Sequence, residues 1–143
     1  MTKATARAHP IQGLVKYHGL RDEEDRHPYH DSISVCTAPT NTTTTVEWLT
    51  DVDAEGGAQD TYLIDDEAVD GRAAERIEMV VEHVRELAGF DHAVRFESEN
   101  SFPSNIGFGS SSSGFAAAAM ALVEAAGLDM SLPEIATVAR RGS

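Results

Sequence analysis

The sequence has little lysine, a single cysteine and no long hydrophobic run. Its 143 residues include 11 basic and 24 acidic side chains, for a net charge of −13, and only Lys3 and Lys16 are lysines. The lack of a basic stripe argues against nucleic acid as a partner. No apolar run reaches the roughly 18 residues of a membrane span, and the N-terminus has no signal-peptide core, so we expect no membrane role.

The acid excess indicates the environment of the protein. An acid-rich, lysine-poor surface stays hydrated in concentrated salt, where screening weakens the repulsion between its charges. We therefore expect a salt-adapted, cytoplasmic protein. The lone Cys36 excludes an internal disulfide, and its place in the alternating stretch SISVCT predicts a small side chain of the core. His27 and His30 flank Pro28 and Tyr29 and are expected to be solvated rather than metal-bound.

Alternation and β-branched residues predict five strands, over residues 3–8, 32–37, 42–48, 61–64 and 92–97. We expect the stretch 32–37 to pair with 42–48, because only a short turn signal separates them. The charged stretch 19–31 contains a proline and is expected to be a loop.

Three helices are predicted in the second half of the chain. Residues 72–88 carry apolar side chains every three or four positions and end before Gly89. That stripe is Ile77, Val80, Val81, Val84 and Leu87. An alanine-rich helix ends at Gly127, and Ser131 begins the last helix with Glu134 in a capping box. Strands followed by a helix, a strand and two helices predict an α+β fold rather than a doubly wound sheet.

The most informative segment is a Gly/Ser-rich turn that runs directly into the alanine-rich helix. Residues 103–114 read PSNIGFGSSSSG. Unpaired amides at the positive end of a helix dipole suit a phosphate, and serine hydroxyls add donors or hold a metal ion. The segment matches neither GxxxxGKS/T nor GxGxxG. A flexible linker is the alternative, but Ile106 and Phe108 favour a ligand site.

Basic residues mark two further segments. Lys16 lies in the largely apolar stretch LVKYHG, and we expect it to serve an anionic ligand rather than to extend into solvent. Arg140 and Arg141 occupy the last turn of the final predicted helix, where compensation of the helix dipole alone would explain them.

Five segments resemble motifs of one enzyme family. Residues 16–23 read KYHGLRDE where the family has a pattern close to KYWGKRDE, 31–37 read DSISVCT for NDSLSVT, and 42–45 read TTTT. Residues 100–117 read NSFPSNIGFGSSSSGFAA for NNFPTAAGLASSAAGFAA, and 139–143 read ARRGS, the start of ARxGSGSACRS. In this order and combination they resemble the diphosphomevalonate decarboxylase branch of the GHMP kinase superfamily.

The resemblance implies ATP- and Mg²⁺-dependent decarboxylation of mevalonate 5-phosphate or 5-diphosphate. The products would be an isopentenyl phosphate or diphosphate, ADP, phosphate and carbon dioxide. It also implies a two-domain α+β fold of the GHMP kinase type. Residues 1–143 would form its ATP-binding N-terminal domain, truncated before the C-terminal domain. Family members are often dimers, so a homodimer is a further expectation.

The resemblance also assigns roles to matching residues. Lys16 would stand beside the catalytic aspartate and Tyr17 in the substrate pocket. Arg76 would bind the substrate carboxylate, Ser143 would contact the substrate, and Ser111 would face the ATP phosphates and the metal ion. The phosphate-binding set comprises Pro103, Gly107, Gly109, Ser110, Ser111, Ser112 and Gly114.

The sequence departs from the family pattern in two ways. The catalytic aspartate would lie beyond Ser143, so we expect the chain alone to be inactive, to leave one face uncovered and to behave poorly in solution. Leu20 stands where the family has a second lysine, and His18 where it has tryptophan. Loss of that cation favours mevalonate 5-phosphate over the diphosphate. A GHMP small-molecule kinase and a non-catalytic phosphate-binding fragment remain as alternatives.

Overall fold

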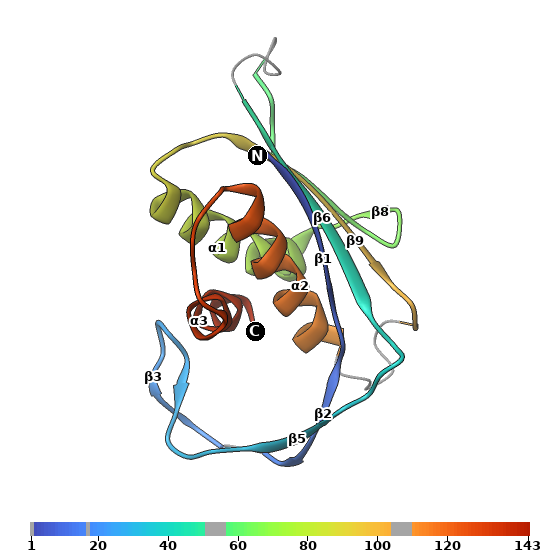
Figure 1. Cartoon of the computed structure of the whole chain (residues 1–143), viewed down its shortest axis with the longest axis vertical. Coiled ribbons are helices and arrows are strands. Elements are labelled where there is room, and N and C mark those ends of the chain that lie inside the picture. The colour runs from blue at the N-terminus through green and yellow to red at the C-terminus, as the bar shows by residue number, and fades with distance from the viewer. Residues whose placement is uncertain (1, 17, 51–56, 104–109) are drawn as a thin grey trace.

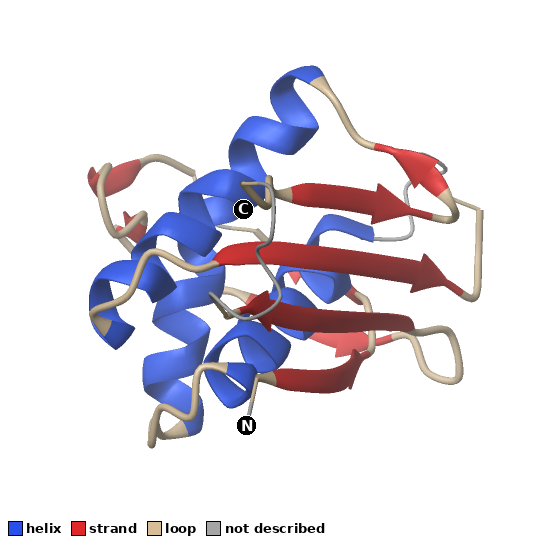
Figure 2. Ribbon diagram, turned by 90° about the horizontal axis from the view of Figure 1, so that it is seen from above, coloured by secondary structure: helices blue, strands red, loops and turns tan. Residues whose placement is uncertain are grey.

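The protein consists of a five-stranded sheet with helices on one face, as Figures 1 and 2 show. The computed structural model describes residues 2–16, 18–50, 57–103 and 110–143. The strands run in the order β1 (Lys3–Ala8), β6 (Thr42–Leu49), β9 (Ala93–Asn100), β7 (Thr61–Ile64) and β8 (Glu67–Ala68). Only β7 and β9 are parallel among these neighbours. The α+β prediction is confirmed.

Three helices cover the sheet in two layers. Helix α2 (Ser110–Ala125) lies against β1 and β6, while α3 (Leu132–Gly142) packs on α2 and on α1 (Gly71–Ala88). Because α2 is enclosed between the sheet and the other helices, it is apolar around most of its circumference. Its alanines are buried and let the helix approach the sheet closely. Among the residues described, no helix is both long and apolar enough to cross a bilayer.

Strict alternation in β6 decides which face of the sheet is the core. Thr42, Thr44, Val46 and Trp48 are buried, whereas their neighbours are half-exposed. On the opposite face most side chains are polar. There Thr45 hydrogen-bonds across the strands to a threonine of β1 at 2.9 Å, and both Lys3 and Arg95 pair with one glutamate of β6.

The helix predictions hold. Gly89 ends α1 in the left-handed region (φ 71°), and the Ser131 N–H donates to the Glu134 carboxylate at 2.8 Å at the start of α3. Hydrogen bonds from Ser131 also lower the pKa of Glu134. Leu87, the last residue of the predicted apolar stripe, stays 46 % exposed at the edge of the buried residues.

The predicted strand pairing in the first half is wrong. Strand β5 (Ile33–Cys36) does not join β6 but pairs with β2 (Ile11–Val15) in a separate two-stranded ribbon. Cys36 is consequently exposed rather than part of the core. The expected loop at 19–31 contains a short hairpin of β3 (Leu20–Asp22) and β4 (His27–Pro28). Alternation alone does not identify the partner of a strand, which explains these errors.

Gly142 lies where α3 approaches the other two helices most closely. A Cβ at this position would overlap the ring of Phe115 and lie 2.7 Å from Cγ2 of Val80.

We predict that Gly142→Ala lowers the free energy of unfolding by about 1–3 kcal/mol, because the added methyl overpacks the helix junction. Urea unfolding followed by circular dichroism measures the change. Gly114→Ala in α2, which meets nothing within 4 Å, is the control and should be neutral or stabilising by up to about 1 kcal/mol. Equal losses in both variants would contradict the overpacking argument.

Asp60 joins three elements through one carboxylate. It accepts hydrogen bonds from Arg85 of α1 (Nη2–Oδ1, 2.5 Å), from the Val94 N–H of β9 (2.9 Å) and from the Tyr62 hydroxyl of β7 (3.1 Å). Arg85 in turn lies over the ring of Trp48, 5.6 Å from its centroid. Burial alone would raise the pKa of Asp60, but these hydrogen bonds outweigh it and hold the pKa below the ordinary 3.8.

This hydrogen-bond network makes the free energy of unfolding depend on pH. Because the pKa of Asp60 is lower in the folded chain than in the unfolded chain, its stabilising effect is complete above about pH 4 to 5 and is lost as the pH falls through the folded value. We predict that Asp60→Asn lowers the free energy of unfolding by about 1–3 kcal/mol at pH 7. The difference in the free energy of unfolding between this variant and the unsubstituted chain should become smaller below pH 4. A gap that stays constant from pH 7 to 3 in urea titrations would refute the assignment.

Candidate functional site

A cavity of about 660 Å³ lies where α2 begins, beside the first turns of α1. The strand residues that line it come from one edge of the sheet, at the start of β6 and the ends of β7 and β9. Uncharged polar lining is contributed by Thr42, Ser98, Asn100, Ser110 and Ser111, charged lining by Asp65, Glu67, Asp70 and Arg76, and apolar lining by Ile64, Val69, Phe96, Phe115 and Ala118, among others. The cavity thus offers both hydrogen-bonding groups and apolar surface to a ligand.

The N-terminus of α2 opens on this cavity. Ser110 is the first residue of the helix, and Ser110, Ser111 and Gly114 all line the space. The first amides of a helix have no partner within it, and they carry the positive end of the dipole. No acidic residue occupies the first turn to offset that charge. The arrangement is suited to an anionic ligand such as a phosphate.

The other two serines of the run face away from the cavity. Ser113 is fully buried, with its hydroxyl 2.7 Å from that of Thr42. The Ser112 hydroxyl accepts a hydrogen bond from the Ile11 N–H at 3.3 Å. These contacts anchor the start of α2 to β6 and β2. The structure therefore separates the predicted set into cavity-lining serines and an anchoring Ser112.

The floor of the cavity is a polar network that the motif analysis missed. The Thr42 hydroxyl donates to Oδ1 of Asn100 at 2.6 Å, and the Asn100 N–H donates to Oδ1 of Asp65 at 2.8 Å. Asp65 sits in the left-handed region (φ 51°) at the turn after β7. Thr42 and Asn100 fall within the quoted TTTT and NSFP motifs, so the motifs were a signal for them. Nothing local marks Asp65, because its contact spans 35 residues.

Arg76 forms the opposite wall and connects all three helices. Its Nε donates to the carbonyl of Gly142 at 2.6 Å, and its guanidinium lies over the Phe115 ring, 4.9 Å from the centroid. Burial, and then the charges of Arg72 and Arg26, lower the pKa of Arg76. The residue that follows this carbonyl, directly after α3, is the exposed Ser143. Two predicted substrate contacts, Arg76 and Ser143, are thereby brought together.

The remaining predicted residues lie elsewhere. Lys16 is exposed directly after β2 and does not line the cavity. Its aliphatic chain folds over Gly13, where an added Cβ would come within 2.9 Å of the Lys16 Cγ. Pro103 is exposed at the end of a described segment, and Tyr17, Gly107 and Gly109 lie outside the described residues.

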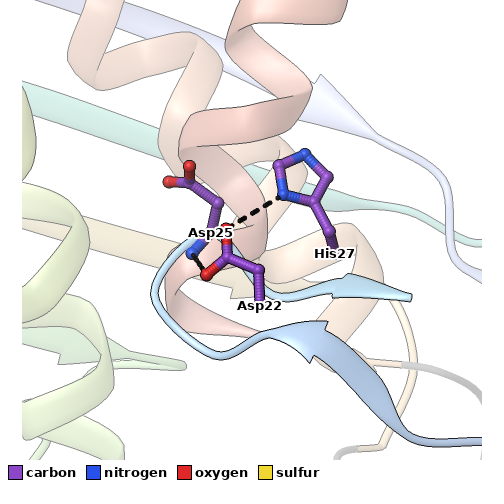
Figure 3. A group of neighbouring side chains, drawn as sticks. All are labelled: Asp22, Asp25 and His27. Atoms are coloured by element: carbon purple, nitrogen blue, oxygen red, sulfur yellow. Dashed lines mark hydrogen bonds and ion pairs between the residues drawn. The ribbon is translucent and has the colours of Figure 1, made fainter. Parts of the chain in front are cut away.

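Asp22, Asp25 and His27 cluster in the β3–β4 hairpin, as Figure 3 shows. One ligand atom from each lies within 4.8 Å of the others, a spacing that a cation could use. Arginines of α3 already occupy two of the three groups, however. Arg141 Nη2 lies 2.9 Å from Oδ1 of Asp25, and Arg140 Nη2 lies 3.3 Å from Nε2 of His27. We therefore interpret the cluster as an ionic clamp between the hairpin and α3.

The clamp changes two expectations from the sequence. His27 is half-buried against α3 rather than solvated, and His30 is exposed as expected. Arg140 and Arg141 do more than compensate a helix dipole, since they hold the hairpin that follows the Lys16 segment. Asp22 keeps the hairpin turn in shape by accepting the N–H groups of Asp25 and Glu24, and these bonds lower its pKa.

Comparison with known proteins gives the family. A model of the diphosphomevalonate decarboxylase-like N-terminal domain matches residues 8–143. The chain belongs to this family. The match spans every segment on which the sequence resemblance rested, including the serines at the start of α2.

Three relatives place this N-terminal domain within longer proteins. It is 72% identical over 141 residues to a phosphomevalonate decarboxylase from Haloferax volcanii, covering 99% of this chain and 42% of that protein. Mevalonate diphosphate decarboxylase from Staphylococcus aureus superimposes with a TM-score of 0.88 at 34% identity, over 99% and 41% of the two chains. A structure of MDDEF in complex with MVAPP, AMPPCP and magnesium superimposes with a TM-score of 0.88 at 32% sequence identity. This match covers 99% of this chain and 42% of the MDDEF chain. The chain spans about two fifths of the length of these relatives.

The ionic clamp of the domain can be tested by exchanging its charges. Arg141 and Asp25 have side chains 23% and 35% exposed, so their attraction is partly shielded from water. We predict that Arg141→Asp and Asp25→Arg each destabilise the fold and that the double exchange recovers about 0.5–1 kcal/mol of coupling. Urea titrations of the four chains measure it. Glu24→Arg is the control: Glu24 is 81% exposed and 3.8 Å from Arg141, so its coupling should be smaller. Purely additive effects in the exchange would show that no clamp exists.

Proposed function

We propose that this chain is the ATP-binding N-terminal domain of an ATP- and Mg²⁺-dependent decarboxylase that acts on mevalonate 5-phosphate. The observation that carries the proposal is the start of α2, where Ser110, Ser111 and Gly114 open on the cavity. The cavity lies within the range of about 300–1,000 Å³ that is usual for small-molecule sites. The name of the Haloferax relative supports the reaction and the substrate.

The residues around the cavity fit a magnesium-bound nucleoside triphosphate. The amides at the start of α2 would receive phosphate oxygens, and the Ser111 hydroxyl would contact the metal ion. Phe96 and Phe115 supply apolar surface that suits a base. ATP supplies the phosphoryl group that turns the tertiary hydroxyl of the substrate into a leaving group. The relative solved with AMPPCP and magnesium supports this assignment.

Lys16, Tyr17, Arg76 and Ser143 would bind the mevalonate moiety. The Nε of Arg76 is committed to Gly142, so its terminal nitrogens would meet the substrate carboxylate. The contact with Gly142 also fixes the guanidinium relative to Ser143. Lys16, on the exposed segment after β2, would place a positive charge near the breaking bond.

Leu20 supports the monophosphate. It is half-buried in β3 opposite Pro28, at the position of the second lysine in the family pattern. An apolar side chain here gives a second phosphate no cationic partner. The acid excess, together with the relative in Haloferax volcanii, supports a salt-adapted cytoplasmic protein.

The proposal is tested by joining residues 1–143 to the part of the Haloferax relative that lies outside the match. We predict that the joined enzyme forms ADP and carbon dioxide together, with at least about tenfold higher kcat/KM for mevalonate 5-phosphate than for the diphosphate. Leu20→Lys should raise diphosphate turnover about 10–100-fold, since one charge-assisted hydrogen bond contributes about 1.5–3 kcal/mol.

The control adds the same charge elsewhere. Leu132→Lys, at the exposed start of α3, should leave the substrate preference unchanged. Formation of ADP without carbon dioxide would indicate a kinase instead, and a preference of the joined enzyme for the diphosphate would overturn the substrate assignment.

A further inference from the structure

The β2–β5 ribbon exposes an unusual amount of apolar surface. It extends away from the five-stranded sheet at the bottom of Figure 1. Its two strands, IQGLV and ISVC, contain no charged residue in a chain that is 24% charged. The exposed side chains and their exposed fractions are Leu14 67%, Ile33 60%, Val15 51%, Val35 46% and Ile11 45%. Scattered apolar residues on a surface are ordinary, but a contiguous set on one element marks an interface.

Apolar side chains lie on both faces of the ribbon, beside Gln12 on one face and Ser34 on the other. Val15 pairs with Ile33, and Val35 lies two residues further along on the same face. Ile11 pairs with Cys36 on the other face. A two-stranded ribbon is barely stable in water without a covering layer. Such a ribbon needs a partner that contacts both sides of it.

We propose that the ribbon is the docking surface for the part of the enzyme that follows this domain in its relatives. Each structural match covers 99% of this chain but only 41–43% of the relative, for the first three solved relatives. More than half of each relative therefore lies outside the match. The inference rests on the proposed function in one respect, the existence of a second domain. That domain holds the ribbon in place and with it the Lys16 segment, which follows β2 directly.

A second copy of the chain fits the ribbon less well. In a two-fold dimer each ribbon would meet its own equivalent across one face, and the other apolar face would remain in water. Two strands of five and four residues also offer little area compared with the roughly 800 Å² per partner of a stable interface. A following domain, linked to the same chain, can enclose both faces without that minimum area.

Cys36 provides a native probe for one face of the ribbon, because its thiol is exposed. We expect maleimide to label Cys36 at least tenfold more slowly in the joined enzyme described above than in the 143-residue chain. Val35→Cys should show the same protection on the opposite face. Peptide mapping by mass spectrometry assigns each label, so other cysteines do not interfere.

Matched controls separate docking from misfolding. Leu132→Cys on α3, at a position 70% exposed, should be labelled equally fast in both proteins. In the joined enzyme, Leu14→Asp should restore fast labelling of Cys36, whereas Leu132→Asp should not. Labelling reports burial without turnover, so failure of the proposed substrate leaves this test intact. Equal rates at Cys36 in the two proteins, or protection in the short chain that grows with its concentration, would overturn the proposal.

Discussion

The placement of α2 against the sheet is the constraint on which the rest of the structure depends. A buried run of alanines brings the helix axis close to β1 and β6, and two hydroxyls fix where the helix begins. Ser113 holds that start to Thr42, and Ser112 holds it to the backbone of Ile11. The same contacts that seal the core therefore determine where the amides of the first turn point. Packing and anion recognition are two results of one helix position.

The end of α3 is the second organising point. Within three residues it supplies a carbonyl to Arg76 and two guanidiniums to the β3–β4 hairpin. Gly142 makes this possible, because only a residue without a side chain lets the helix come so near Phe115. The ARRGS motif at residues 139–143, part of the family resemblance, thus also makes structural contacts. Mutations in it will affect both the stability of the fold and the candidate site.

Much of the fold and part of the site could be predicted from sequence. Period and caps identified α1 and α3 because helix signals are local, and the serine-rich turn identified the start of α2. The pairing of β5 with β2 could not be predicted, since the nearer β6 had an equally good pattern. Asp65 and the contacts of the two clamp arginines could not be predicted either, because the partners lie 35 to 116 residues away. The exposure of Cys36 follows from the same mispaired strand.

The outer face of the sheet affects how the domain responds to high salt. There β1 and β6 adhere partly through hydroxyl pairs such as Thr5 with Thr45, which carry no net charge. Ions in solution shield charged partners but leave dipolar ones nearly unaffected. Transfer from dilute buffer to molar potassium chloride would therefore loosen the β3–β4 hairpin before it loosened the threonine-rich strands. Ionic strength becomes a means of separating the motions of two parts of one small domain.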